Sequence, residues 1–193
     1  MICGLQKMTL LDFPGKVACT VFLGGCNFRC PFCHNSDLLK GSSQNVIEKE
    51  EFFEFLASRK GKLDGVCITG GEPLLQPDTV EFIKEIRSLG FLVKLDTNGS
   101  FYEKLQYIIE NKLCDYVAMD VKNSLAEYRK TTASSCDEVK IKESIEMIKD
   151  LLDSICSMNA RVVNIAATTE EISAQSDTIR DLSDGIQGEV NAI

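Results

Sequence analysis

Three cysteines stand close together in one short segment of the chain. Cys26, Cys30 and Cys33 follow directly after the apolar run Val17–Leu23. Thiolates are soft ligands that suit iron–sulfur clusters, and a cluster that only transfers electrons is normally closed by four cysteines. No fourth cysteine follows at a matching interval. The spacing therefore predicts a cubane cluster in which one iron is left open for a substrate or cofactor.

A zinc site is the alternative for the same segment, because zinc sites with three cysteines and one histidine exist. The only histidine, His34, adjoins Cys33. Adjacent residues are sterically awkward as ligands of one ion, so we expect His34 to orient the loop or to face a partner. Six further cysteines are scattered and are expected to be small core or surface residues: Cys3, Cys19, Cys67, Cys114, Cys136 and Cys156.

The bulk composition narrows the class of protein. The chain has 193 residues, of which 44% are hydrophobic and 26% charged, with a net charge of −8. No basic stripe is present, which disfavours nucleic-acid binding. We find no signal peptide and no apolar run long enough to span a bilayer. We therefore expect a cytoplasmic protein without membrane partners, whose reduced cysteines bind metal rather than form disulfides.

Apolar runs and amphipathic segments alternate along the first two thirds of the chain. The predicted strands are Val17–Leu23, Gly65–Thr69, Phe91–Asp96 and Tyr116–Val121, and the predicted helices are Lys49–Lys60, Pro77–Leu89 and Tyr102–Leu113. Alternation of this kind predicts an α/β fold with parallel strands and right-handed crossovers. Each strand ends in a polar or glycine-rich turn, and sites in such folds form at these carboxyl ends.

Two of these turns resemble motifs of radical S-adenosylmethionine (SAM) enzymes. The first is the cysteine segment with Phe32 before its last cysteine, and the second is Thr69-Gly-Gly-Glu-Pro73 at the end of the next strand. The resemblance implies a partial parallel (βα) barrel that carries a [4Fe-4S] cluster on the three cysteines, and this chain departs from the family in that its barrel is truncated after about four strands. It also implies that SAM chelates the open iron. Phe32 then packs against adenine, or alternatively in the core of its loop.

The remaining strand ends resemble turns of glycyl-radical-enzyme activases, a subset of the same family. The resemblance implies that the polar residues of these turns, which follow the third and fourth predicted strands, bind SAM and supply ligands for a monovalent cation. Tight-turn chemistry is the alternative for Asp96 and Asn98, and a solvated charge is the alternative for Lys122. The full predicted cofactor-binding set is Phe32, Gly70, Gly71, Glu72, Pro73, Asp96, Thr97, Asn98, Asp120 and Lys122.

The amino-terminal segment Gly4–Lys16 resembles the activating proteins of anaerobic ribonucleoside-triphosphate reductase. The resemblance implies that SAM is cleaved to methionine and a 5′-deoxyadenosyl radical, which abstracts hydrogen from a backbone glycine of the reductase. Reduced flavodoxin or ferredoxin is the implied electron donor. The alternatives are a pyruvate formate-lyase-type activase, in which the opening of the chain differs at Asp12–Gly15, and a truncated or fused product without catalysis.

The composition changes after about Asp137, and we divide the chain into a core at 1–136 and a helical segment at 137–193. Apolar residues then recur at seven-residue intervals: Leu151, Met158, Ile165, Ile172, Ile179, Ile186 and Ile193. This pattern predicts a coiled coil or helical hairpin, with one amphipathic helix that covers the barrel as the alternative. Asn164–Ile179 resembles the signalling helix of chemotaxis receptors, which suggests a fusion or a rearranged gene.

Overall fold

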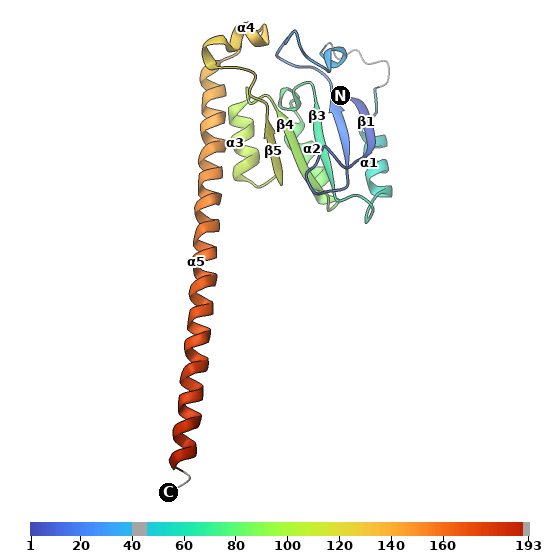
Figure 1. Cartoon of the computed structure of the whole chain (residues 1–193). Coiled ribbons are helices and arrows are strands. Elements are labelled where there is room, and N and C mark those ends of the chain that lie inside the picture. The colour runs from blue at the N-terminus through green and yellow to red at the C-terminus, as the bar shows by residue number, and fades with distance from the viewer. Residues whose placement is uncertain (40–45, 191–193) are drawn as a thin grey trace. The chain divides into compact units, whose positions relative to one another are not determined.

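Four strands of one sheet run parallel and place their carboxyl ends at the same edge. The computed structural model describes residues 1–39 and 46–190, and beyond residue 162 it describes only some of the side chains. The strand order is β1-β2-β3-β4-β5, and β1 alone pairs antiparallel with its neighbour (Figure 1). The strands are β1 (Ile2–Thr9), β2 (Ala18–Leu23), β3 (Gly65–Gly70), β4 (Leu92–Thr97) and β5 (Tyr116–Met119).

This topology confirms the predicted α/β class and all four parallel strands. The predicted ends of these strands lie within two residues of the observed ends. β1 was not predicted. It pairs with β2 along an interrupted register that runs from Ile2 opposite Leu23 to Thr9 opposite Ala18. Only the ends of β1 are buried, and its middle residues are exposed. The segment therefore lacks the continuous apolar pattern by which the parallel strands were recognised.

Three helices connect the parallel strands. They are α1 (Lys49–Ser58), α2 (Thr79–Ser88) and α3 (Tyr102–Glu110). Because β2 to β5 follow one another in a single direction, right-handed crossovers place these helices on the same face of the sheet. Their buried side chains form the core with the strands: Phe52, Leu56, Phe82, Ile83, Ile86, Leu105 and Ile108. Each predicted helix extends beyond the observed one at its carboxyl end, because the last residues form turns instead.

One long helix, α5 (Glu138–Val190), follows the sheet after the short helix α4 (Tyr128–Thr132). In the described part of the chain, 3₁₀ turns lie after β2 at Ser36–Leu38, after β3 at Pro73–Leu75 and after β5 at Leu125–Glu127. The first turns of α5 belong to the α/β unit: Ile141 is fully buried beside Phe28 and Tyr128. The Ser144 hydroxyl donates to the Gly99 carbonyl at 2.8 Å. This packing joins the start of α5 to the cysteine segment.

The chain divides into two compact units, Met1–Met147 and Ile148–Ile193. The division falls inside α5, whereas we placed the boundary between residues 136 and 137, and that domain boundary stays a prediction. In the second unit, Leu151, Met158 and Ile165 are exposed. The side chains of Ile172, Ile179 and Ile186, and all of Ile193, lie outside the described residues. The coiled-coil and chemotaxis-receptor hypotheses therefore stay predictions. No helix among the described residues is long and apolar enough to cross a membrane.

Candidate functional site

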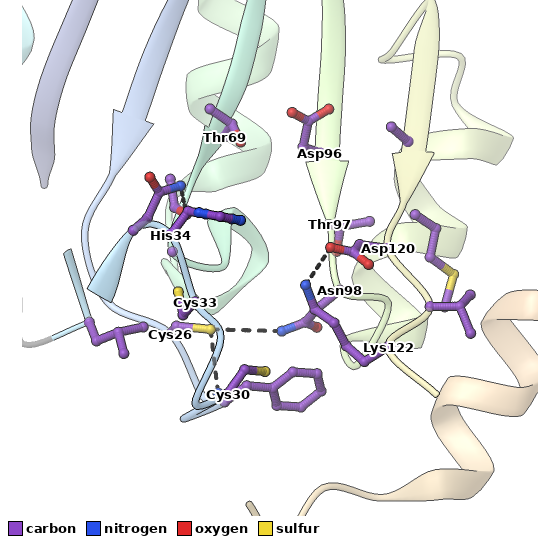
Figure 2. A pocket seen from close by; sticks show the side chains of 18 of the residues that line it. Cys26, Cys30, Cys33, His34, Thr69, Asp96, Thr97, Asn98, Asp120 and Lys122 are labelled. Atoms are coloured by element: carbon purple, nitrogen blue, oxygen red, sulfur yellow. Dashed lines mark hydrogen bonds and ion pairs between the residues drawn. The ribbon is translucent and has the colours of Figure 1, made fainter. Parts of the chain in front are cut away.

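A cavity of about 790 Å³ lies at the carboxyl ends of the parallel strands. Figure 2 shows the cysteine loop on one side of it and the ends of β4 and β5 on the other. Most of the residues singled out from the sequence line this cavity: Cys26, Cys30, Phe32, Cys33, His34, Gly70, Gly71, Asp96, Thr97, Asn98, Asp120 and Lys122. Two predicted residues, Glu72 and Pro73, are not among its lining residues. Motifs from four separate turns thus meet in one place.

Backbone hydrogen bonds tie the cysteine loop to three other segments. The Gly25 N–H donates to the Leu38 carbonyl, and the Gly25 carbonyl accepts from the Glu72 N–H, both at 2.8 Å. Farther along the loop, the Arg29 N–H donates to the Thr132 carbonyl at 2.8 Å. Phe28 is buried against Tyr128, with the two rings nearly perpendicular. The loop is therefore positioned by contacts with the protein itself.

The three thiols are half-buried and free. Burial raises the pKa of the Cys26 thiol, and the nearby Glu72, Cys30 and Cys33 raise it further. A bound metal ion deprotonates such a thiol outright, so a metal in the cavity would offset the free-energy cost of ionising a buried thiol. Burial likewise raises the pKa of Cys30, although the neighbouring Lys122 lowers it. This donor set fits a metal centre with soft sulfur ligands.

The three cysteines of the loop line the same cavity. Within residues 1–39 and 46–190, no three His, Cys, Asp or Glu side chains are grouped closely enough to hold one metal ion. Ligands of one zinc ion converge on a point, whereas ligands of a cubane cluster bind separate irons and need not be close together. Cys26, Cys30 and Cys33 share a cavity without converging on a point. Which of the two the cysteines hold therefore stays a prediction.

Gly70 and Gly71 are required by the chain itself. Gly70 has φ of +119°, and a Cβ there would lie 2.3 Å from the Leu23 carbonyl oxygen. A Cβ on Gly71 would lie 1.9 Å from the Gly25 carbonyl oxygen. Both glycines belong to the predicted cofactor-binding set, and a residue without a side chain lets backbone approach a ligand closely. The structure adds another reason: the glycine turn presses directly against the backbone that leads into the cysteine loop.

Glu72 lies beneath the cavity wall and is fully buried. Its carboxylate accepts hydrogen bonds from Asn98 N at 2.7 Å, Thr97 Oγ1 at 2.8 Å and Leu74 N at 3.1 Å. Burial raises the pKa of Glu72 to about 7, against the opposing effect of these three donors. What the structure shows for Glu72 is a cross-link between the turns after β3 and β4. Its contact with SAM stays a prediction.

Asp96 is held by a lysine that the sequence motifs do not include. Lys94, two residues earlier on β4, contacts the Asp96 carboxylate and is 7% exposed. Its ammonium also lies 3.6 Å from Cys67 Sγ. Although burial alone lowers it, the hydrogen bond to Asp96 raises the pKa of Lys94 above its ordinary value. A charged residue inside an otherwise apolar strand was the signal available in the sequence.

Asp120 and Lys122 form an ion pair at the end of β5. The Lys122 ammonium lies 5.9 Å from the centre of the Phe32 ring, within reach of a cation–π contact. Phe32 is 52% exposed and lines the cavity, so it is not a core residue of its loop. The side chain of Lys122 is mostly covered. A planar aromatic ring and an ammonium group thus face the same cavity.

Comparison with known proteins agrees with this site. The radical SAM superfamily model matches residues 20–170. A Methanocaldococcus jannaschii protein, described by inference as a glycyl-radical enzyme activating enzyme, is 34% identical over 95% of this chain and 74% of its own length. The pyruvate formate-lyase-activating enzyme of Clostridium pasteurianum is 32% identical over 63% of this chain, and the match spans about half (52%) of that enzyme.

A solved structure supports the fold. The tagged protein anSMEcpe with bound AdoMet superimposes with a TM-score of 0.50 at 19% identity, over 66% of this chain and 38% of that one. Similarity at this level of identity bears on the fold alone. The family model covers most of the chain, including the cysteine loop and all the turns of the cavity. The chain therefore belongs to the radical SAM superfamily.

Proposed function

We propose that this chain activates a glycyl-radical enzyme. The observation that carries the proposal is the convergence of the cysteine loop with the turns after β3, β4 and β5 on one cavity. Relatives whose names state this activity support it. In this proposal a [4Fe-4S] cluster on Cys26, Cys30 and Cys33 supplies the one-electron chemistry that cleaves SAM and starts hydrogen abstraction from a glycine of the partner.

The residues of the chain bind and orient rather than transfer protons. Gly70 and Gly71 offer backbone at the cavity wall, and the buried Glu72 holds the turns after β3 and β4 together. In this proposal the Lys122 ammonium binds the carboxylate of SAM, and Phe32 stacks on its adenine; the neighbouring positions of the two side chains support these roles. Asp96, Thr97 and Asp120 are the proposed monovalent-cation ligands, although Asp96 and Asp120 each already contact an ammonium group.

We assign anaerobic ribonucleoside-triphosphate reductase as the partner, with reduced flavodoxin or ferredoxin as electron donor. The support for this choice is the amino-terminal segment Gly4–Lys16, which resembles the activating proteins of that reductase. A pyruvate formate-lyase-type activase is the second candidate. It is favoured by the Clostridium pasteurianum relative, whose match covers 63% of this chain.

Anaerobic reconstitution with iron and sulfide tests the proposal. We expect one [4Fe-4S] cluster per chain and, after reduction with dithionite, release of 5′-deoxyadenosine from SAM. Mixing the reduced protein with each partner, the reductase or pyruvate formate-lyase, is expected to give a glycine-centred electron paramagnetic resonance (EPR) signal with the true partner only. Omission of sodium and potassium from the buffer tests the cation in the same assay.

Cysteine variants provide the matched control. Cys30→Ala removes one cluster ligand and is expected to abolish 5′-deoxyadenosine formation. Cys156→Ser changes an exposed cysteine of α5 and is expected to leave it unchanged. Cleavage of SAM by the Cys30 variant at the parental rate contradicts the site assignment. One zinc per chain without iron or sulfide contradicts the cluster, and a loaded cluster that never cleaves SAM favours a product without catalysis.

A further inference from the structure

The side-chain amide of Asn98 has one fixed orientation. Its oxygen Oδ1 accepts hydrogen bonds from the Ser100 backbone N–H at 2.9 Å and from the Ser100 hydroxyl at 2.6 Å. A backbone N–H can only donate, so the atom that faces it must be the amide oxygen. The amide nitrogen of Asn98 therefore points to the opposite side, toward the cysteine loop.

That nitrogen meets two groups of the cysteine loop. Asn98 Nδ2 donates to Asn27 Oδ1 at 2.9 Å and lies 3.9 Å from Cys26 Sγ, the contact drawn in Figure 2. Asn27 Nδ2 in turn donates to the Ser100 hydroxyl at 2.8 Å, which closes a ring of three polar side chains. With one Nδ2 hydrogen bound to Asn27, the other is left for the sulfur of Cys26.

The surroundings hold Asn98 in this position. The residue is 7% exposed, and its backbone N–H is bound by the buried carboxylate of Glu72. Neither end of the amide can turn without breaking the bonds to Ser100 or Asn27. The Phe28 backbone N–H provides a second donor to the same sulfur, at 3.4 Å. Cys26 is thus the target of two N–H donors, of which only Asn98 can be altered by substitution.

We propose that Asn98 is a positioning residue that raises the reduction potential of the cluster through its N–H contact with Cys26. This inference rests on the proposed function, in which Cys26 binds an iron. Hydrogen bonds to ligand sulfurs and outer-shell partners tune the potential of iron–sulfur clusters. A donor hydrogen draws electron density from the thiolate and favours the more negative, reduced cluster. Ser100 and Asn27 act by fixing which end of the amide faces the sulfur.

The test measures the midpoint potential of the reconstituted cluster by EPR-monitored titration without SAM. We expect Asn98→Ala to shift the potential to more negative values. Asn98→Asp places oxygen and negative charge near the same sulfur, so its shift is expected to be larger. Ser100→Ala removes the hydroxyl of the ring and loosens the amide, so its shift is expected to be smaller. Asn123→Ala changes an exposed asparagine that binds Thr131 and is expected to give the parental value.

The outcomes separate this inference from the function on which it rests. If the parent assembles no [4Fe-4S] cluster, the proposed function fails. If the parent and Asn98→Ala both carry full iron and sulfide and have equal potentials, the inference is overturned and the proposed function stands. If neither Asn98 variant assembles a cluster, the midpoint potential of Ser100→Ala tests the inference instead. A parental potential in that variant overturns the inference. A purely structural role for Asn98 predicts changes in cluster content without a shift in potential.

Discussion

Glu72 is the most unusual titratable residue of the site, because its carboxyl group is fully buried yet surrounded by donors. The pKa of this group rises from 4.5 to about 7 on folding. Between these pH values the native state binds more protons than the unfolded state. Stability from this group is therefore greatest below about pH 4.5 and falls as the pH rises toward 7.

Glu72→Gln is expected to remove this pH dependence. One pKa unit corresponds to about 1.4 kcal/mol, so the parent loses roughly 3 kcal/mol more of its unfolding free energy between about pH 4.5 and about pH 7.5 than the variant does. Urea unfolding of the metal-free protein at both pH values measures the difference. Equal slopes for the parent and the variant would show that Glu72 titrates normally.

Gly71 has no room for a side chain. Gly71→Ala places a methyl group against the Gly25 carbonyl, so the glycine turn or the cysteine loop must move. We expect a loss of about 1–3 kcal/mol of stability, as for other overpacked sites, together with reduced iron content after reconstitution. Gly4→Ala is the matched control, because a Cβ there meets Phe22 only at ordinary contact distance, 3.5 Å. Full iron content in the Gly71 variant would contradict the close approach.

The sequence predicted the residues of the site better than it predicted their contacts. Motif spacing located the cysteines and the turns after β3, β4 and β5, because carboxyl ends of parallel strands meet at one edge. It predicted that Glu72 contacts SAM, which stays a prediction, but it did not predict that Glu72 is fully buried and accepts three hydrogen bonds from the protein. Lys94 and Asn27 were missed, since Lys94 belongs to no motif and Asn27 stands between two cysteines of the motif at a position that the spacing does not specify.

At the scale of elements, the first turns of α5 stabilise the cysteine loop. Ile141 is fully buried in the cluster with Phe28 and Tyr128, and Cys26 and Cys30 pack against that cluster. Ile141→Ala is expected to cost about 2–5 kcal/mol of unfolding free energy and to lower the retention of iron.

Ile155→Ala is the control for this prediction, because it makes the same change in the same helix at a 41% exposed position. We expect its effect to stay within about 0.5 kcal/mol, as is usual for surface substitutions. Thermal unfolding and iron analysis compare the two variants. Equal losses of stability and iron in both variants would mean that the hydrophobic cluster around Ile141 does not stabilise the cysteine loop.

The parallel strands were predictable because each is an apolar run followed by a turn. β1 was not, because its exposed middle residues resemble a loop, and its place at the sheet edge depends on pairing with β2. The predicted helices extend too far at their carboxyl ends for a related reason. Arg59 and Asn111 continue the helical composition, but the chain turns at both positions to enter the next strand.

At the scale of the whole molecule, the site is confined to the first unit. Every residue that lines the cavity lies at or before Lys122, and the first unit extends to Met147. A chain that ends at Met147 is therefore expected to bind as much iron and sulfide per molecule as the full chain. Its helical circular dichroism signal is expected to fall, because most of α5 is removed.

The result also tests the predicted division of the chain. Loss of cluster binding in the shortened chain would mean that residues 148–193 are needed for folding of the α/β unit. Retention would identify the second unit as an addition, whose exposed Leu151, Met158 and Ile165 are then free for another role.

The three backbone tethers of the cysteine loop have a consequence for damage by oxygen. Leu38, Glu72 and Thr132 hold the loop through main-chain bonds that involve no iron. In the proposed function, a protein that loses its cluster to oxygen is therefore expected to keep these bonds and with them the shape of the loop. Fresh iron and sulfide are then expected to rebuild the cluster on a folded protein, without renewed synthesis of the polypeptide.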